Sequence, residues 1–368
     1  MKKTLQSLVL AASLMGSASY LKAQQDPYVT HYMFNRSIYN PGAVGVGGRY
    51  CLSAMSHYQF TGYEDRTPEF HTSANPRAPQ RSVGPKTQMF AFSAPVPLFT
   101  RKDANDQNIN YGGVGIAFVN DKLGYEFSTN VKLQAAGRLP MANSASIALG
   151  LEYDFLQKGV DGNRLLPLAP GDPRIPNAKV SQVKGNYAAG IYYNNPLVNN
   201  GSWKDLWGGL SFSNLKKNNY EITSGSSTTA YAYSNTVMHT YIMGGITKSD
   251  FMGNPDLELL PSTMIKYNAV LQIDATAMIK YQQRLWGGIA YRSTTDAFSV
   301  LLGYSGFQGK FQGLRVGYSY DLTLSKVLSV SSGTHELQLN YCFEIVRTVP
   351  EKIKILNPRH LLKDPNLD

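Results

Sequence analysis

Six histidines and two cysteines are the residues of this chain best suited to bind a metal or to act as nucleophiles. The sequence contains no HExxH motif, no histidine pair at i, i+4, no CxxC motif and no glycine-rich loop followed by Lys and Ser/Thr. A hydrolytic triad could use His57 and Asp65, but no serine lies in a recognisable nucleophile motif. We therefore expect a protein that is not an enzyme and that binds no metal or cofactor. The histidines are His31, His57, His71, His239, His335 and His360.

Eight charged residues are candidates to line a polar interior. They have both signs and occupy the polar positions of segments in which polar and apolar residues alternate: Lys132, Glu152, Asp154, Asp274, Lys280, Arg292, Arg315 and Asp321. Mixed signs favour a lining in which the charges pair with one another, and a selectivity site for ions is the alternative. Since no ring of a single sign is present, a dedicated ion pore is disfavoured.

The alternating segments predict the elements that position these charges. In residues 271–282 one parity reads Leu, Ile, Ala, Ala, Ile, Tyr and the other reads Gln, Asp, Thr, Met, Lys, Gln, and residues 314–321 and 336–343 alternate in the same way. Successive side chains of a strand lie on opposite faces, so each segment has one apolar and one polar face. A strand of about ten residues crosses a membrane. The sequence therefore predicts an all-β fold, a transmembrane antiparallel β-barrel.

Counting such segments along the chain gives about 14 strands, an even number as is usual in bacterial barrels. The predicted strands are residues 49–60, 86–96, 111–121, 127–139, 144–155, 186–194, 206–214, 239–248, 258–267, 270–282, 285–292, 297–307, 310–322 and 334–345. Glycine pairs within them, such as those at 112–113, 208–209 and 244–245, are attributed to tight barrel curvature.

Loop lengths indicate how the barrel is oriented. If the first strand rises from the periplasm, the long connections at residues 61–85, 157–185, 215–238 and 323–333 are all extracellular. The connections at 140–143, 283–284 and 308–309 are then tight periplasmic turns, which is the asymmetry of outer-membrane barrels. Three other periplasmic connections, 97–110, 196–205 and 249–257, are longer than this pattern predicts.

The N-terminus has the features of a secretory signal peptide. Lys2 and Lys3 precede an apolar run at residues 5–14, and Leu21-Lys22-Ala23 is a plausible cleavage site. The predicted location is the cell outer membrane, with extracellular loops and both termini in the periplasm. The predicted organisation is a signal peptide at 1–23, a plug or periplasmic segment at 24–48, the barrel at 49–346 and a periplasmic C-terminal tail at 347–368.

Composition agrees with an outer-membrane protein. Tyrosine is the commonest aromatic residue, with 24 copies, and interfacial girdles of barrels are rich in aromatic residues. The formal charge of +10 falls to +7 when Lys2, Lys3 and Lys22 leave with the signal peptide. The remaining positive charges are scattered along the chain, whereas a nucleic-acid surface would gather them on one face. We expect no nucleic-acid partner and contact with outer-membrane lipid.

Two segments do not fit the strand pattern. Residues 25–48 read QDPYVTHYMFNRSIYNPGAVGVGG, with no regular period. They form either a periplasmic strap or a plug in the barrel lumen, and the residues predicted to plug the lumen or to contact a partner are Tyr32, Met33, Phe34, Asn35, Asn40 and Pro41. The tail at 347–368 is either a disordered end or, because of its Ile and Leu residues, a docking strand or short helix.

The two cysteines fall near the ends of the first and last predicted strands. In a closed barrel these strands are neighbours, and antiparallel pairing brings Cys51 and Cys342 to the same rim. The two cysteines therefore form either a disulfide across this seam, in the oxidising periplasm, or two free thiols.

Several motifs resemble the PorP/SprF family of outer-membrane proteins of the Bacteroidetes. The residues that carry the resemblance are Asp26-Pro27, Tyr32-Met33-Phe34-Asn35, Asn40-Pro41, WGGLS at 207–211, WGGIAYR at 286–292, DAFSVLLGY at 296–304, GYSYDL at 317–322 and SSGTHE at 331–336. Gly42 departs from the Asn-Pro-Ala that is usual in the family. The resemblance implies a role in type IX secretion and, in many members, in surface display of adhesins linked to gliding motility. It also implies two kinds of partner: secreted adhesins with a C-terminal sorting domain, and lipoproteins of the periplasmic secretion ring.

Two functions are therefore predicted as alternatives. The first is a non-enzymatic component of type IX secretion that assists export and surface anchoring of secreted adhesins. The second is a barrel transporter or channel for small hydrophobic molecules with an N-terminal hatch. The polar inner parity favours the first, because sites for apolar ligands are lined mainly by apolar side chains.

Overall fold

The computed structural model describes a large part of the chain, including every predicted strand. The described residues are 27, 29–65, 81–96, 100–102, 108–141, 144–165, 176, 178–198, 201–223, 230–268, 270–293, 297–323 and 331–344. The predicted signal peptide at 1–23 and the predicted tail at 347–368 lie outside them.

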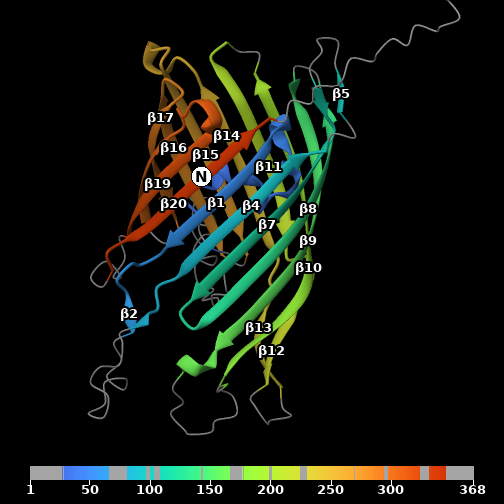
Figure 1. Cartoon of the computed structure of the whole chain (residues 1–368), viewed down its shortest axis with the longest axis vertical. Coiled ribbons are helices and arrows are strands. Elements are labelled where there is room, and N and C mark those ends of the chain that lie inside the picture. Colours follow the sequence, from blue (N-terminus) through green and yellow to red (C-terminus); the bar gives the residue numbers. More distant parts are fainter. Residues whose placement is uncertain are drawn as a thin grey trace, which may run out of the picture.

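Fourteen antiparallel strands form one closed barrel, which confirms the predicted fold class and strand count (Figure 1). Around the wall each barrel strand pairs with the next barrel strand along the chain. The first, β1, also pairs with the last, β20, and this pairing closes the barrel. The barrel strands are β1 (Tyr50–Tyr58), β4 (Lys86–Pro95), β7 (Gly112–Leu123), β8 (Glu126–Pro140), β9 (Ser146–Asp161), β10 (Lys179–Leu197), β11 (Trp203–Ser213), β14 (His239–Lys248), β15 (Leu257–Tyr267), β16 (Leu271–Tyr281), β17 (Leu285–Arg292), β18 (Ala297–Tyr304), β19 (Leu314–Thr323) and β20 (Thr334–Phe343).

The alternation in the sequence corresponds to the two faces of the wall. In β16 the odd-numbered residues from Leu271 to Tyr281 are exposed on the outside, whereas Gln272, Asp274 and Thr276 are buried within the barrel. The outer face thus presents an apolar surface to lipid. The inner face holds polar and charged side chains, which must find partners there because burial removes them from bulk water.

We call the end of the barrel at which β1 begins and β20 ends the terminal end, and the opposite end the far end. Three two-stranded hairpins lie outside the closed barrel: β2 (Glu64–Asp65) with β3 (Arg81–Ser82), β5 (Thr100–Lys102) with β6 (Asn108–Asn110), and β12 (Asn219–Thr223) with β13 (Ala230–Asn235). Figure 1 shows β12 and β13 at the far end and β5 at the terminal end.

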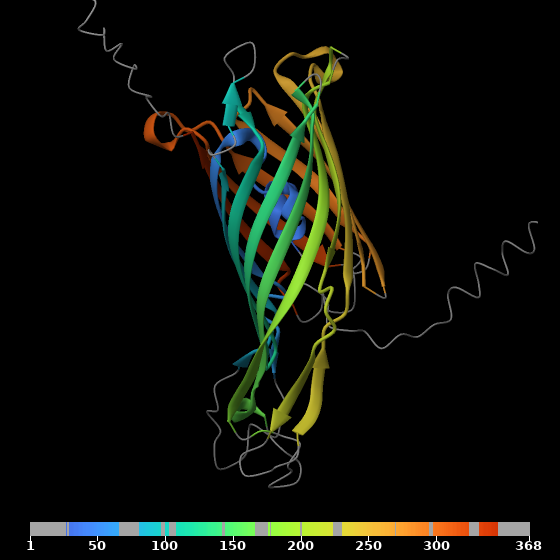
Figure 2. The same cartoon turned by 90° about the vertical axis from the view of Figure 1, so that its right-hand side faces the viewer.

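Strands β8, β9 and β10 project beyond the others at the far end (Figure 2). They have 15, 16 and 19 residues, well above the length needed to cross a membrane. The expected loop at 157–185 is therefore partly wrong, because β9 continues to Asp161 and β10 begins at Lys179. Outside the membrane both faces of a strand are wet, so the polar–apolar alternation that marks the spanning part is lost.

Of two tight turns predicted at the terminal end, the structure contains one. The tight turn at 283–284 is present between β16 and β17. The tight turn expected at 308–309 is wrong, because residues 305–313 form a longer connection that contains the 3-10 helix η9 (Gly309–Phe311). Gly309 and Gly313 both have positive φ there, and Gly313 directly precedes β19.

The remaining described helices are short. They are η1 (Tyr32–Phe34), α2 (Arg36–Tyr39), η2 (Pro41–Ala43), η3 (Val46–Gly48), η7 (Gly162–Arg164) and η8 (Phe251–Gly253). None of the helices in the described part of the chain is long and apolar enough to cross a membrane.

Candidate functional site

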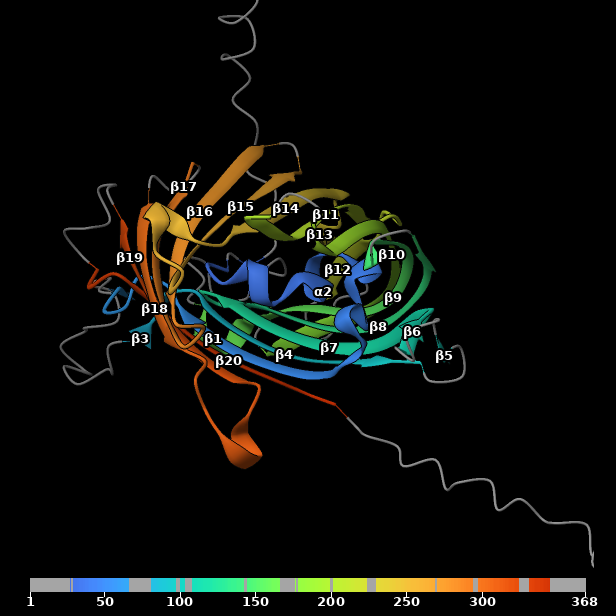
Figure 3. The same ribbon diagram turned by 90° about the horizontal axis from the view of Figure 1, so that it is seen from above.

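Residues 29–48 are here called the N-terminal segment. Residues 29–45 are buried or half-buried inside the barrel, and the segment ends at the exposed Gly47 and Gly48. Seen from above, α2 sits within the ring of strands (Figure 3), and the same blue coil is visible behind the wall in Figure 2. The segment folds into four successive single turns, η1, α2, η2 and η3. Such short turns leave many backbone groups without partners of their own, so the wall must supply them.

Glu336 on β20 is one of these partners. Its carboxylate accepts hydrogen bonds from the backbone N–H groups of Thr30 at 2.8 Å and His31 at 2.9 Å. The Nδ1 atoms of His31 and His57 lie 2.6 and 2.9 Å from its two oxygens. All three titratable side chains are almost completely buried. One carboxylate therefore joins the start of the segment to both β1 and β20.

A second charged group lies beside this cluster. The guanidinium of Arg292 on β17 is 3.4 Å from a carboxylate oxygen of Asp321 and 3.5 Å from one of Asp274. It also donates to the hydroxyl of Thr30 at 3.4 Å. The positive charge is thus held between two carboxylates, and the N-terminal segment takes part in the network.

Asn40 and Pro41 attach the middle of the segment to the opposite side of the wall. The Asn40 amide donates to the carbonyl of Ile191 at 2.9 Å and accepts from the Gly42 backbone N–H at 2.8 Å, and it thereby caps η2. Pro41 at the first helical position is suited to this turn because it needs no N–H partner.

Three glycines of the wall make room for this approach. A Cβ on Gly150 would lie 2.2 Å from the Gly42 nitrogen, one on Gly190 would lie 2.3 Å from the Asn40 side-chain oxygen, and one on Gly209 would lie 2.5 Å from its amide nitrogen. These distances are far below van der Waals contact. The glycines of β9, β10 and β11 therefore allow another stretch of backbone to lie against the strands.

Several glycines of the wall, including some of those attributed to barrel curvature, also make room for neighbouring groups. A Cβ on Gly113 would lie 2.6 Å from the Val44 carbonyl oxygen, so this glycine also accommodates the segment. Gly245 accommodates the indole of Trp207, and Gly303 and Gly317 accommodate that of Trp286. The physical reason is space for bulky groups inside the barrel.

Side chains of strand β8 hold the rest of the segment by donating hydrogen bonds to the backbone carbonyl groups of the segment. Arg138 donates to the carbonyl oxygens of Val44 and Gly45, both at 3.0 Å. Lys132 donates to the Ile38 carbonyl at 3.3 Å and pairs with Glu152 at 2.8 Å. On β4, the Ser93 hydroxyl accepts a hydrogen bond from the Gly45 N–H at 2.8 Å.

Aromatic and amide contacts complete the attachment. Phe34 packs edge-on against Trp286 with 5.2 Å between ring centres, and Asn35 exchanges hydrogen bonds with the Gln338 amide. The Tyr32 hydroxyl donates to Ser262 at 3.1 Å, and burial raises the pKa of Tyr32 to about 12. Met33 is buried beside them.

The structure thus places all six predicted segment residues inside the barrel, in contact with the wall or buried near it. Of the eight predicted lining charges, six are buried, and the exceptions, Lys280 and Arg315, are half-buried near the terminal end. Sequence reasoning missed His31 of the segment and the wall residues that hold the segment, namely His57, Arg138, Gly150, Gly190, Glu336 and Gln338.

Two cavities flank the segment. One of about 70 Å³ lies toward the far end, where Ile38 and Tyr39 contribute to its lining. The other, of about 530 Å³, lies toward the terminal end and is lined by Met33, Phe34 and Arg36 of the segment. Among the described residues no group of three or more His, Cys, Asp or Glu side chains is placed to hold a metal ion.

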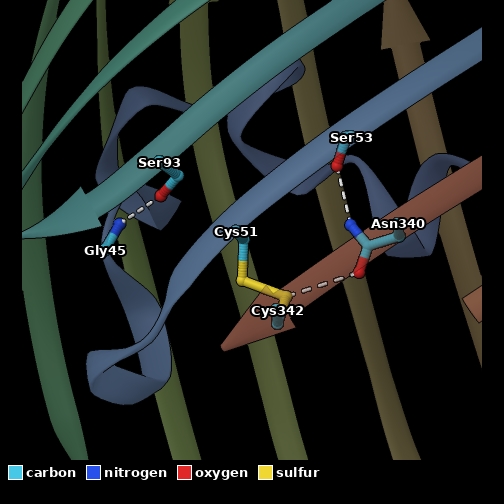
Figure 4. The surroundings of a disulfide bond; sticks show 6 residues. All are labelled: Gly45, Cys51, Ser53, Ser93, Asn340 and Cys342. Atoms are coloured by element: carbon cyan, nitrogen blue, oxygen red, sulfur yellow. Dashed lines mark hydrogen bonds between the residues drawn. A yellow bond between two sulfur atoms is a disulfide. The ribbon is translucent and has the colours of Figure 1, made fainter. Parts of the chain in front are cut away.

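Cys51 and Cys342 form a disulfide across the seam between β1 and β20 (Figure 4). They are paired in the strand register, with 4.1 Å between their Cα atoms. The neighbouring Ser53 and Asn340 side chains join the same two strands through a 2.7 Å hydrogen bond. The covalent link therefore lies at the terminal rim, next to the larger cavity.

Reduction of this disulfide is expected to lower the thermal midpoint of barrel unfolding. A cross-link between residues 291 positions apart restricts the unfolded chain, and disulfides typically contribute about 2–4 kcal/mol. Heat-modifiable gel migration with and without reductant measures the midpoint. The C51S/C342S double variant is the control, because reductant should not change its midpoint. Equal midpoints for the oxidised and reduced native protein would contradict the expectation.

The comparisons with known proteins give a family and a set of similar barrels. The family model described as "Type IX secretion system membrane protein PorP/SprF" matches residues 21–341. No curated protein matches the chain. Among solved structures, the Ralstonia pickettii toluene transporter TbuX is similar at 11% identity and a TM-score of 0.46, covering 85% of this chain and 94% of the other.

Two further solved structures are similar to the chain at comparably low identity. The translocator domain of autotransporter NalP from Neisseria meningitidis is 10% identical, with a TM-score of 0.38 and coverage of 92% of this chain and 98% of the other. The Acinetobacter baumannii outer membrane protein Omp33 is 7% identical, with a TM-score of 0.40 and coverage of 81% and 100%. The family match spans nearly the whole described barrel together with its N-terminal segment. The chain therefore belongs to the PorP/SprF family of type IX secretion system membrane proteins.

Proposed function

We propose that this protein is a non-enzymatic outer-membrane component of type IX secretion that assists the export and surface anchoring of secreted adhesins. In this proposal its N-terminal segment acts as a plug. The barrel then serves as a docking platform and not as a route for solutes. The proposed orientation is the one predicted from loop lengths, with the far end outside the cell and the terminal end in the periplasm.

The observation that carries the proposal is the way in which the segment is attached. Its bonds reach strands all around the wall, through Glu336 on β20, Arg292 on β17, Ile191 on β10, Arg138 on β8 and Ser93 on β4. A gate that opened for each passing solute would have to break these bonds together. A permanently filled lumen is better suited to a protein that binds its partners at the two rims.

The projecting end offers a surface for such a partner. Beyond the membrane-spanning part, the β12–β13 hairpin packs against β9 and β10. The Tyr220 hydroxyl of β12 donates to the Leu156 carbonyl of β9 at 3.0 Å. The backbone N–H of Glu221 donates to the Gln182 side chain at 3.1 Å. This end is thus braced, and in our proposal it contacts the exported adhesin while the terminal end faces the lipoproteins of the secretion ring.

Transport of small hydrophobic molecules is the less supported function. The wall offers the segment charged and hydrogen-bonding groups, among them Arg292 and Lys132, which pair with carboxylates. Its apolar side chains, such as Met264, Met278 and Trp286, pack in one cluster with Val29, Met33 and Tyr39 of the segment. Apolar ligands are bound by mainly apolar linings. With the segment in place, the apolar side chains of the inner wall that such a ligand would need already pack against the segment itself.

Affinity purification from the native outer membrane in mild detergent, followed by mass spectrometry, tests the proposal. We expect a large secreted protein with a C-terminal sorting domain, or periplasmic ring lipoproteins, at near-stoichiometric amounts. An unrelated abundant barrel purified with the same tag is the control. A barrel recovered alone with bound small apolar molecules would contradict the proposal and favour transport.

A further inference from the structure

The larger cavity, toward the terminal end, has an unbalanced charge. Four cationic side chains line it, namely Arg36, Arg49, Lys280 and Arg315, against one carboxylate, that of Asp205. Nearby Glu258 is already neutralised by Lys204, whose nitrogen lies 2.5 Å from its carboxylate. Within the described residues, no carboxylate lies within ion-pair distance of any of the four cations.

Two of the cations are held with their charge available to a ligand. The guanidinium carbon of Arg36 lies 3.9 Å above the ring of Trp207, and that of Arg315 lies 4.2 Å above the ring of Phe34. A guanidinium stacked on an aromatic ring keeps the N–H groups along its edge free for a planar, bidentate acceptor. Arg36 uses two of its N–H groups, toward Met33 and Tyr192.

The cations come from four places in the chain, namely α2, the residue before β1, and strands β16 and β19. Arg36 and Arg49 repel the charge of Arg315, so holding them together without an anion costs free energy. Apolar side chains share the lining with these charges, among them Phe34, Leu260, Met278 and Leu314. A single phosphate would leave this apolar part of the lining without a partner.

We propose that this cavity binds an acidic peptide segment of a partner protein, whose carboxylates pair with Arg36, Arg49, Lys280 and Arg315 while its apolar side chains contact Phe34 and Leu260. At about 530 Å³ the cavity has room for a few residues and not for a folded domain. In the orientation proposed above, this peptide approaches from the periplasm.

Binding of a fluorescent hexaglutamate peptide to the purified, folded barrel tests the proposal. We expect saturable binding that weakens with added salt, and no binding of hexaglutamine, because the attraction is between charges. The R315Q/K280Q double variant removes two cavity charges without removing a hydrogen bond to the segment backbone. It is expected to weaken binding about tenfold or more, which corresponds to about 1.4 kcal/mol.

The matched control is the K86Q/K122Q double variant, which removes two charges from paired positions of β4 and β7 at the far end. It should bind the peptide as the native protein does. Equal affinity for the two double variants would overturn the proposal, and so would inorganic phosphate that competes as strongly as the peptide at equal charge. Peptide binding is measured on the purified barrel alone. An absence of peptide binding would therefore contradict this proposal and not the secretion function, which the copurification experiment tests.

Discussion

Replacing Gly150 by alanine is expected to expel the middle of the N-terminal segment from the wall. The new Cβ would lie 2.2 Å from the Gly42 nitrogen and the Pro41 carbonyl carbon, both of which are backbone atoms that cannot rotate away. Overpacking of this kind costs about 1–3 kcal/mol. The open population of the segment should therefore rise about 5- to 150-fold.

Thiol labelling measures this opening. A V44C substitution places a reporter at a buried position of the segment, and the two native cysteines do not react because they form a disulfide. We expect faster maleimide labelling of V44C when Gly150→Ala is added. Gly137→Ala on the neighbouring strand β8 is the matched control, since a Cβ there would have no atom within 4 Å. Equal labelling rates in the two backgrounds would contradict the packing described here.

The second large effect is expected from Glu336→Gln. The carboxylate oxygens accept two backbone N–H groups of the segment and face the Nδ1 atoms of two histidines. An amide replaces one acceptor by an NH₂ group, which would point at these donors. Breaking one partner of a buried charged cluster costs about 3–5 kcal/mol. The start of the segment should therefore detach about 100-fold more often, or more.

The reporter for this change is V29C, at a fully buried position next to Thr30. Maleimide labelling of V29C should accelerate strongly in the Glu336→Gln background. Glu258→Gln is the control, because Glu258 contacts Lys204 and Gln283 and no residue of the segment. If both amide variants labelled at the native rate, Glu336 would not anchor the segment.

The strands could be predicted from the sequence because a membrane barrel imposes its pattern on every spanning residue. Lipid outside and polar contacts inside require the alternation seen in β16, and the prediction was accurate wherever both surroundings are present. It was wrong at residues 157–185, where the strands leave the membrane, and at 308–309, where a single 3-10 turn lengthens the connection.

The interior contacts could be predicted only in part. The N-terminal segment has no period, so its position depends on bonds between residues about 300 apart in the chain, such as Asn35 with Gln338. One clue was present, however. His57 and Glu336 are paired in the strand register, six residues along both strands from the paired Cys51 and Cys342. A register taken from the cysteines would have brought the histidine and the glutamate together.

The tyrosines also could be predicted only in part from the sequence. Their number indicated interfacial girdles, and Tyr58, Tyr267 and Tyr281 are indeed exposed near strand ends. Tyr192 and Tyr241 instead lie buried within the barrel, where Tyr192 accepts a hydrogen bond from Arg36. Composition alone does not distinguish the two uses, because the same side chain can serve a membrane interface or a packed interior.

Planar-bilayer conductance tests most directly whether the barrel is closed by its own N-terminal segment. The purified full-length mature protein is compared with a variant that lacks residues 25–48, after heat-modifiable migration has shown that both are folded. We predict that the intact protein produces no conductance steps and that the deletion variant produces discrete ones. A folded deletion variant as silent as the intact protein, or an intact protein that conducts as well as the variant, would contradict the role of the segment as a plug.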